Sequence, residues 1–388
     1  MTKESFDGIS TRAIHGTLQI SPDHSPVTTP IYQSSAFVHP VGSSEEVMYT
    51  RHGNNPNQVT LGAKLAALEG AEHAIFLASG MGATALAHLA VLRPGDHLLA
   101  SSWIYGGTLR LFTQEFGKLG IDVSFVAPDS QRNWRRRVRK TTRAIFVETP
   151  TDPTMRVVDL EPLATFSRER GIALIVDSTF ATPVNFRPLE HGADVVIHSA
   201  TKYLNGHSDI IGGFVAGSEA IVEEVRLLMQ VWGQAPDPHA TWLAERGLKT
   251  LAVRMERHNA NGLAFATWAA QHPAVLKVHY PGLPDHQDHE IAARTLDGYG
   301  GMVGLTLAGG AAAADAALRE LKLAIHAPSL GGVETLVSEP RFTSHVDMSS
   351  EERADLGMPD GYIRVSLGIE DVADIIADFE DAFAALQP

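Results

Sequence analysis

Apolar residues in the middle of the chain form short runs separated by longer amphipathic stretches, and this alternation begins near residue 60. The longer stretches, such as residues 60–70, 108–119 and 160–170, have the spacing of helices. The short runs predict strands at residues 73–78, 97–101, 123–127, 144–148, 173–176, 195–198 and 213–216. Strand alternating with helix is typical of a mainly parallel sheet covered on both faces. The pattern therefore predicts an α/β fold with a seven-stranded open sheet.

The strand rhythm stops after Gly217, and the rest of the chain has a different pattern. Segments with helical or strand periodicity follow at residues 221–232, 240–272, 302–307, 362–367 and 371–386. The last of these has one apolar face, as a helix packed on a core requires. We expect an α/β domain over residues 56–248 and a smaller α+β domain over residues 249–388.

The first fifty residues are rich in proline, serine and threonine and are too polar to form a core of their own. They predict an extended arm over residues 1–55. Arms of this kind pack on something else, often a second subunit.

Composition excludes several classes of partner. The 388 residues carry a formal net charge of −14, which argues against nucleic acid or an anionic membrane as a partner. The basic run over residues 132–143 has Trp134 and Val138 at helical spacing, so a solvated helix face is expected there. Residues 74–92 carry no formally charged residue, but Ser79, Gly80 and Gly82 interrupt them. We expect a strand, a glycine turn and a buried helix there, and no membrane span.

The chain contains no cysteine. Disulfides, thiolate metal sites and cysteine nucleophiles are therefore excluded, and no metal site is expected. The first ten residues are polar and show no signal peptide. A reducing cytoplasm is the expected location.

Candidate chemistry follows the strands, because ligands of open α/β sheets gather beyond their carboxyl ends. Ser79-Gly80-Met81 follows the first predicted strand and opens a helix, so its free N–H groups suit an anion such as phosphate. A purely steric need for glycine is the alternative. Asp177 ends another apolar strand, where a carboxylate needs a cationic partner unless it caps a helix.

A lysine flanked by hydroxyls follows the next strand, in Ser199-Ala200-Thr201-Lys202. The hydroxyls suit a phosphate and a desolvated amine suits a Schiff base, whereas a lone solvent-exposed lysine is the commoner case. Pyridoxal 5'-phosphate (PLP) requires a lysine, a carboxylate for its ring nitrogen and a phosphate cradle. The joint occurrence of all three at separate strand ends favours PLP.

The sequence also resembles the Cys/Met-metabolism PLP enzymes, which include cystathionine γ-synthase, cystathionine γ- and β-lyases, methionine γ-lyase and O-acetylhomoserine sulfhydrylase. The resemblance runs from about Thr28 to the C-terminus. Its motifs include Tyr49-Thr50-Arg51, Tyr105-Gly106-Gly107-Thr108, Glu148-Thr149-Pro150, Val176-Asp177-Ser178-Thr179-Phe180, Ser329-Leu330-Gly331-Gly332-Val333-Glu334 and Arg364-Val365-Ser366-Leu367-Gly368. It implies the fold type I architecture of PLP-dependent transferases.

The resemblance assigns roles residue by residue. Lys202 is similar to the lysine that holds the cofactor and later moves protons from Cα, and Asp177 to the acid that keeps the pyridine nitrogen protonated. Tyr105 resembles the tyrosine stacked on the cofactor ring, which also acts near the leaving atom. The implied phosphate ligands are Gly80, Met81, Ser199 and Thr201, with Tyr49 and Arg51 from a neighbouring subunit.

On the substrate side, Arg364 resembles the arginine that binds the α-carboxylate in bidentate fashion. Ser329, Glu334 and Arg110 match further substrate-side positions. The cross-subunit contact implies a homodimer as the catalytic unit, and family members are commonly homotetramers.

The chain departs from the family pattern in places. The segment after the Tyr-x-Arg motif, residues 53–57, is one residue longer than usual, Ser178 replaces a frequent asparagine, and Arg341 is added near the substrate pocket. Gly107 stands where methionine γ-lyases carry cysteine, whereas Glu334 and Arg110 favour γ-chemistry.

We expect γ-elimination from a sulfur-containing or similarly γ-substituted amino acid, such as cystathionine, methionine or a homoserine derivative. γ-Replacement on an O-acylated homoserine is the alternative, and β-elimination a minor one. A PLP-binding protein without catalysis is disfavoured by the joint presence of Lys202, Asp177, Tyr105 and Arg364, and a generic aminotransferase by the resemblance.

Overall fold

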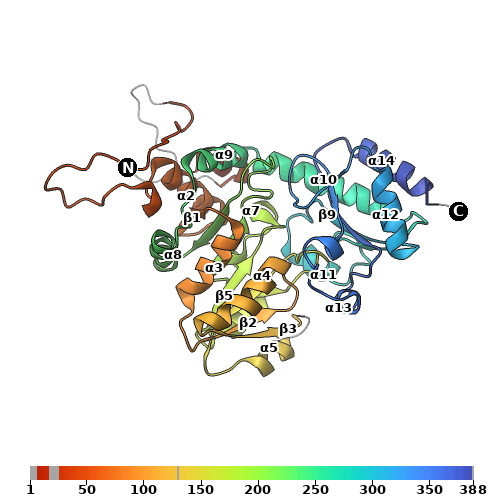
Figure 1. The fold of residues 1–388 in the computed structure, drawn as a ribbon, viewed down its shortest axis with the longest axis horizontal. Coiled ribbons are helices and arrows are strands. Elements are labelled where there is room, and N and C mark those ends of the chain that lie inside the picture. The colour runs from red at the N-terminus through yellow and green to blue at the C-terminus, as the bar shows by residue number, and fades with distance from the viewer. Residues whose placement is uncertain (1–6, 17–25, 129–130, 387–388) are drawn as a thin grey trace.

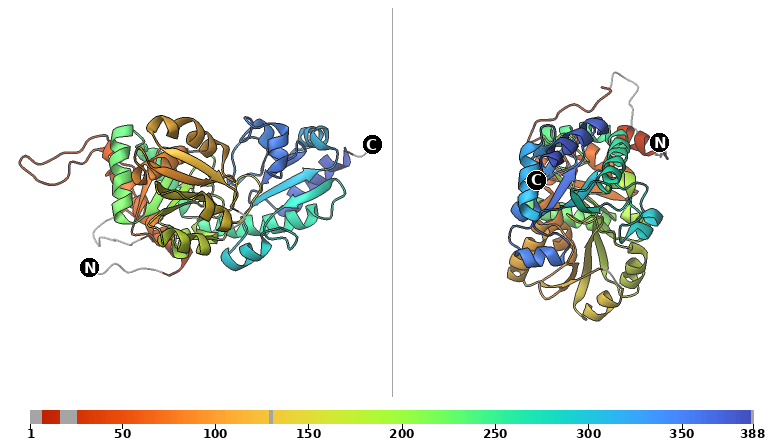
Figure 2. Two further views of the ribbon diagram at one scale, coloured as in Figure 1. Left: turned by 90° about the horizontal axis from the view of Figure 1, so that it is seen from below. Right: turned by 90° about the vertical axis from the view of Figure 1, so that its right-hand side faces the viewer.

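The computed structural model describes residues 7–16, 26–128 and 131–386. Two β-sheets, each with its own helices, lie side by side (Figures 1 and 2). The arm predicted over residues 1–55 lies partly outside the described residues, namely at residues 1–6 and 17–25. Its described part contains α1 (Ile9–His15) and an extended stretch that projects from the body in Figure 1.

The larger sheet has seven strands in the order β1-β7-β6-β5-β4-β2-β3. Its strands are β1 (His73–Leu77), β2 (His97–Ser101), β3 (Asp122–Val126), β4 (Thr142–Glu148), β5 (Ala173–Asp177), β6 (Val195–Ser199) and β7 (Gly213–Gly217). Only β7 runs against its neighbours, β1 and β6, and the other pairs are parallel. The predicted seven-stranded, mostly parallel sheet is confirmed.

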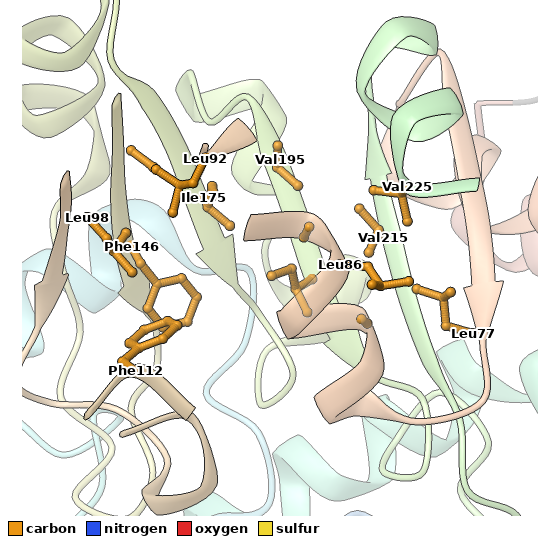
Figure 3. Close-up of a cluster of buried hydrophobic side chains, with 14 of the residues drawn as sticks. Leu77, Leu86, Leu92, Leu98, Phe112, Phe146, Ile175, Val195, Val215 and Val225 are labelled. Carbon is orange, nitrogen blue, oxygen red and sulfur yellow. The ribbon is translucent and has the colours of Figure 1, made fainter. Parts of the chain in front are cut away.

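Alternate residues of the strands pack on opposite faces of this sheet, because the side-chain period of a strand is two. Phe146 and Ile175 belong to the cluster that includes Leu86 of α3 (Figure 3). Ile145 and Leu174 belong to the cluster on the other face. Both faces are apolar and buried, which explains why these strands read as continuous hydrophobic runs.

The helices of this part of the chain are α2 (Pro56–Glu69), α3 (Gly80–Val91), α4 (Gly106–Arg110), α5 (Gln131–Arg137), α6 (Leu160–Arg168), α7 (Thr182–Asn185), α8 (Glu219–Trp232) and α9 (Pro238–Leu248). The continuous helix predicted over residues 108–119 is instead α4 followed by a π-helical turn (Leu111–Glu115) and a 3₁₀ turn (Phe116–Leu119). In α5, Trp134 is buried and Arg135 to Arg137 are exposed, as a solvated face requires. No helix of residues 7–16, 26–128 and 131–386 is long and apolar enough to cross a membrane.

The single helix predicted over residues 240–272 is wrong. Helix α9 ends at Leu248 and α10 (Leu251–Ala269) begins after Thr250. The carbonyl of Gly247 accepts hydrogen bonds from the Thr250 hydroxyl and from the Arg254 guanidinium, 3.1 and 3.0 Å away. These side chains satisfy the Gly247 carbonyl where the helical hydrogen bonding is interrupted. The spacing of apolar residues does not reveal such an interruption.

The second sheet has five strands in the order β10-β11-β12-β9-β8 and lies in the blue part of Figure 1. Its strands and helices are β8 (Val275–His279), α11 (His289–Thr295), β9 (Met302–Leu307), α12 (Gly310–Glu320), β10 (Ile325–His326), β11 (Leu336–Ser338), α13 (Ser350–Asp355), β12 (Tyr362–Ser366) and α14 (Val372–Ala384). Phe379 and Phe383 of α14 pack with Phe265 of α10 in its core. The predicted smaller α+β part is confirmed, while its boundary at residue 249 stays a prediction.

The loop after β4 contacts the part of the chain that carries the second sheet. The Tyr362 hydroxyl of β12 donates a hydrogen bond to the Pro153 carbonyl. Arg156 donates two hydrogen bonds to Asp288, with its Nε 2.5 Å from Oδ2. This loop is therefore held against the second sheet, beside the ends of the central strands.

Candidate active site

A cavity of about 550 Å³ lies at the carboxyl ends of β4, β5 and β6 and is also lined by Arg364 of β12 and by residues 328–330 and 342–344, which precede and follow β11. It is lined by residues that lie far apart in the sequence. Among the predicted site residues, the cavity brings together Gly80, Met81, Tyr105, Asp177, Ser199, Thr201, Lys202, Ser329 and Arg364. Tyr49, Arg51, Arg110 and Glu334 do not line it.

Lys202 follows β6 and reaches into the cavity, where its Nζ donates a hydrogen bond of 2.8 Å to the Ser329 hydroxyl. Burial and, to a lesser extent, the Arg364 guanidinium lower the pKa of the Lys202 amine to about 8, although Asp152 opposes the shift. A lower pKa increases the fraction of unprotonated amine near neutral pH, which is the nucleophilic form. The residue therefore has the environment that imine formation requires.

Asp177 ends β5 with its carboxyl buried at the cavity. Its Oδ1 accepts hydrogen bonds from the Thr179 N–H and hydroxyl, at 2.9 and 2.6 Å. Burial raises its pKa, while the two bonds from Thr179 and the charge of His198 oppose this. Asp177 does not cap a helix, since the next helix, α7, begins at Thr182. A buried carboxyl group with a raised pKa needs a cationic partner to stay ionised, and a protonated pyridine nitrogen is such a partner.

The turn after β1 has the form of a phosphate cradle. Ser79 caps α3 by accepting a hydrogen bond from the Gly82 N–H at 3.0 Å. The first N–H groups of a helix have no intrahelical acceptor and are available to an anion. A Cβ at Gly80 would lie 2.7 Å from the Ser199 hydroxyl oxygen, so glycine is required for this close approach. The hydroxyls of Ser199 and Thr201 also line the cavity.

Tyr105 follows β2 and its side chain is 41% exposed at the cavity. Its backbone N–H donates a hydrogen bond of 2.8 Å to Glu148 Oε2. Burial raises the pKa of the Tyr105 hydroxyl, and Asp152 raises it further. A Cβ at Gly107 would lie 2.4 Å from Tyr105 Cε1. The glycine therefore permits the observed position of the ring, and a cysteine there would displace it.

Arg364 of β12 is 5% exposed and forms a buried ion pair with Asp152, with its Nη1 2.7 Å from Oδ1. Its Nη2 donates a hydrogen bond of 3.0 Å to the Ser329 carbonyl. Ser329 has a φ of 93°, which is unusual for a residue other than glycine. It accepts from Lys202 through its hydroxyl and from Arg364 through its carbonyl, so this strained residue connects the two cations.

Glu148, Asp152 and Thr179 line the cavity but were not predicted as site residues. Glu148 is buried and accepts hydrogen bonds from the N–H groups of Tyr105 and Asp152. Burial raises its pKa well above the usual range, and Asp177 and Asp152 add to this effect. The available signal was the position of Glu148 at the end of a predicted strand, shortly before Pro150 and Pro153.

The predicted residues outside the cavity have other contacts. Arg110 forms an exposed ion pair with Asp347 at 3.4 Å. Glu334 accepts a hydrogen bond from the Ser208 hydroxyl. Arg51 donates to the Gln230 carbonyl and lies over the ring of Tyr49, 5.5 Å from its centroid.

Two departures from the family pattern have structural roles. In the longer loop, Asn54 accepts a hydrogen bond of 2.9 Å from the Tyr49 N–H, and Asn55 caps α2 in a capping box with Gln58. Arg341 pairs with Glu339 and Asp315 and does not line the cavity. The extra asparagine therefore supports the Tyr-x-Arg segment, and the added arginine is neutralised beside the cavity.

Comparison with known proteins gives matches over nearly the whole chain. The family described as Cys/Met metabolism PLP-dependent enzyme matches residues 10–384. The chain is 41% identical over 382 residues to a cystathionine gamma-synthase of Mycobacterium tuberculosis, covering 98% of this chain and 97% of that protein. It is 39% identical over 374 residues to a cystathionine gamma-lyase of Bacillus subtilis, covering 96% and 98%. A solved structure of cystathionine gamma synthase from Xanthomonas oryzae pv. oryzae, in complex with aminoacrylate and cysteine, has a TM-score of 0.93 at 35% identity, covering 97% of this chain and 98% of that chain.

Proposed function

Because this chain belongs to the family of Cys/Met metabolism PLP-dependent enzymes, we propose that it catalyses γ-elimination from an amino acid that carries sulfur or a related heteroatom on Cγ. The predicted family, the fold type I architecture and PLP as the cofactor are confirmed by the matches. The observation that carries the proposal is the position of Lys202, with an amine pKa lowered to about 8, in one cavity with Asp177, Tyr105 and Arg364.

The cavity residues fit PLP. Lys202 would hold its aldehyde carbon, Asp177 its ring nitrogen, and the turn at Gly80 with Ser199 and Thr201 its phosphate. Bound PLP supplies an electron sink that stabilises negative charge on the carbon next to the substrate amino group. The residues of this chain then have to bind, orient and move protons around that carbon.

Arg364 binds the substrate α-carboxylate and thereby fixes the orientation of Cα. The released Lys202 amine removes the Cα proton and passes it to the electron-sink system that bound PLP would supply. Unprotonated again, the same amine removes a Cβ proton, and the heteroatom group leaves from Cγ with the electron pair of its bond. Tyr105, exposed at the cavity, donates or accepts a proton at the leaving atom. The raised pKa of its hydroxyl favours the protonated form, which can donate.

Lys202→Ala tests this assignment. We expect the variant to lose the visible absorption of bound PLP and its turnover, because no amine remains to form the imine. A variant that kept both the chromophore and the turnover would refute the role of Lys202.

γ-Replacement is the second candidate, favoured by the 41% identity with a cystathionine gamma-synthase. It shares the proton transfers of elimination but ends with addition of a thiol at Cγ. A substrate panel separates the two: cystathionine, methionine and O-acetylhomoserine, each with and without cysteine, assayed for keto acid against new thioether. Keto acid without added thiol supports elimination, whereas a thioether formed only with thiol supports replacement.

We further propose that the catalytic unit is a homodimer in which Tyr49 and Arg51 of one subunit complete the phosphate site of the other. Both residues lie outside the cavity of their own chain. The arm beside them carries exposed apolar residues, including Val38 and Val41, that a second subunit would cover. The homotetramer and the cytoplasmic location stay predictions.

Complementation tests this sharing. Arg51→Ala and Lys202→Ala should each be poorly active alone, but unfolding and refolding them together gives mixed dimers with one intact site. Random pairing predicts recovery of about a quarter of wild-type activity. No recovery from a mixture that forms dimers would show that Arg51 serves its own chain.

A further inference from the structure

The buried carboxylate of Asp152 uses part of the hydrogen-bonding capacity of Arg364, the arginine that we assign to the substrate carboxylate. Asp152 and Arg364 are 212 residues apart and pair at 2.7 Å, with side chains only 4% and 5% exposed. Both line the cavity. The Asp152 backbone is fixed in turn, because its N–H donates a hydrogen bond of 2.5 Å to Glu148 Oε1.

The guanidinium of Arg364 is only partly used by these contacts. Of the five N–H groups of an arginine, one is bonded to Asp152 and one to the Ser329 carbonyl. Its Nε is buried and has no hydrogen-bond partner among the described residues. The remaining N–H groups leave room for a second carboxylate on the same cation.

We propose that Asp152 sets the affinity of this cavity for the carboxylate of its amino-acid substrate, by holding Arg364 in position while neutralising part of its charge. This inference rests on the proposed function. An amino acid that enters the cavity brings its carboxylate to a cation that already carries one negative partner. Its binding is therefore weaker than at an unpaired arginine, because like charges repel strongly in a buried site.

The titratable groups that interact with Asp152 come from several elements. Glu148 and Asp177 lie at the ends of β4 and β5, Lys202 follows β6, and His345 lies in the loop after β11. Asp152 raises the pKa of the Lys202 amine, whereas Arg364 lowers it. The carboxylate thus acts on the two cations of the cavity at once, and its removal should be detectable at both.

Asp152→Asn is the direct test, because the amide oxygen still accepts a hydrogen bond from Arg364 while the charge is lost. The probe is acetate, which presents a carboxylate without an amino group. We expect the inhibition constant of acetate against the holoenzyme to fall by about tenfold or more. The pH at which the visible absorption of bound PLP changes should also shift downward, a readout that does not depend on turnover.

Two further variants make the test specific. Asp152→Ser also lacks the charge and gives a second measurement if the amide does not fit. Asp381→Asn removes one negative charge on α14, where Asp381 forms an exposed pair with Lys322, and should leave both readouts unchanged.

Unchanged acetate inhibition and an unchanged pH midpoint in a folded, PLP-loaded Asp152→Asn enzyme would overturn the proposal and leave the pair as a structural tether. A wild-type protein that bound no PLP would instead refute the proposed function.

Discussion

Replacing Arg364 by lysine keeps the positive charge of the cavity but removes the planar fork. In the structure one nitrogen reaches Asp152 at 2.7 Å and another reaches the Ser329 carbonyl at 3.0 Å. The lysine side chain is shorter and ends in a single ammonium group, so it does not bond to both Asp152 and the Ser329 carbonyl. It also does not bind a substrate carboxylate in bidentate fashion. We therefore expect a loss in both stability and catalysis.

The size of each loss follows from one hydrogen bond. The bond from the Arg364 guanidinium to the Ser329 carbonyl has a charged donor, and such a bond contributes about 1.5–3 kcal/mol to stability, so its loss sets the expected destabilisation. One charge-assisted bond to the substrate likewise contributes about 1.5–3 kcal/mol. At about 1.4 kcal/mol for each factor of ten, kcat/KM of Arg364→Lys should fall by about ten- to hundredfold.

Steady-state kinetics on cystathionine and urea unfolding measure the two losses. The matched control is Arg353→Lys, because Arg353 has the same kinds of partner, the Met348 carbonyl and the Asp360 carboxylate, yet does not line the cavity. The control should lose similar stability and keep its kcat/KM. An Arg364→Lys enzyme with unchanged kcat/KM, or an equal kinetic loss in both variants, would refute the assignment of the substrate carboxylate to Arg364.

Three further predictions follow from individual contacts. The pKa of the Lys202 amine is lowered to about 8, and only the unprotonated amine reacts with PLP. The rate of PLP uptake by the cofactor-free protein, measured by stopped flow, should therefore rise with pH with a midpoint near 8. A midpoint near the ordinary lysine value of 10.5 would contradict this. Gly107→Ala should displace the Tyr105 ring, which lies 2.4 Å from the added Cβ, and lower kcat/KM by about tenfold with little change in the melting temperature; unaltered kinetics would show that the ring position is unimportant. Glu148→Gln places an NH₂ group against one of two backbone donors, the N–H groups of Tyr105 and Asp152. The free energy of unfolding in urea should therefore fall by about 1–3 kcal/mol, and a fall of less than about 0.5 kcal/mol would count against this role.

The sequence by itself determined the strands and the chemistry that follows them. All seven runs predicted for the larger sheet overlap observed strands, and Asp177 and Lys202 follow two of them, as predicted. This information is local: side-chain periodicity and the residue types just beyond a strand do not depend on distant parts of the chain. The order of the strands, with β7 inserted between β1 and β6, is not local and came only from the structure.

Contacts between distant segments were decided by the tertiary structure alone. The pairing of Arg364 with Asp152 and the bridging role of Ser329 join positions that no periodicity connects. The break between α9 and α10 depends on side-chain bonds to the Gly247 carbonyl, and apolar spacing continues across it. Burial also acts at this level, because only packing around the cavity lowers the pKa of Lys202 and raises that of Glu148. The residues that we propose for the chemistry can thus be found from the sequence, while their pairing and protonation depend on the distant groups that the fold packs against them.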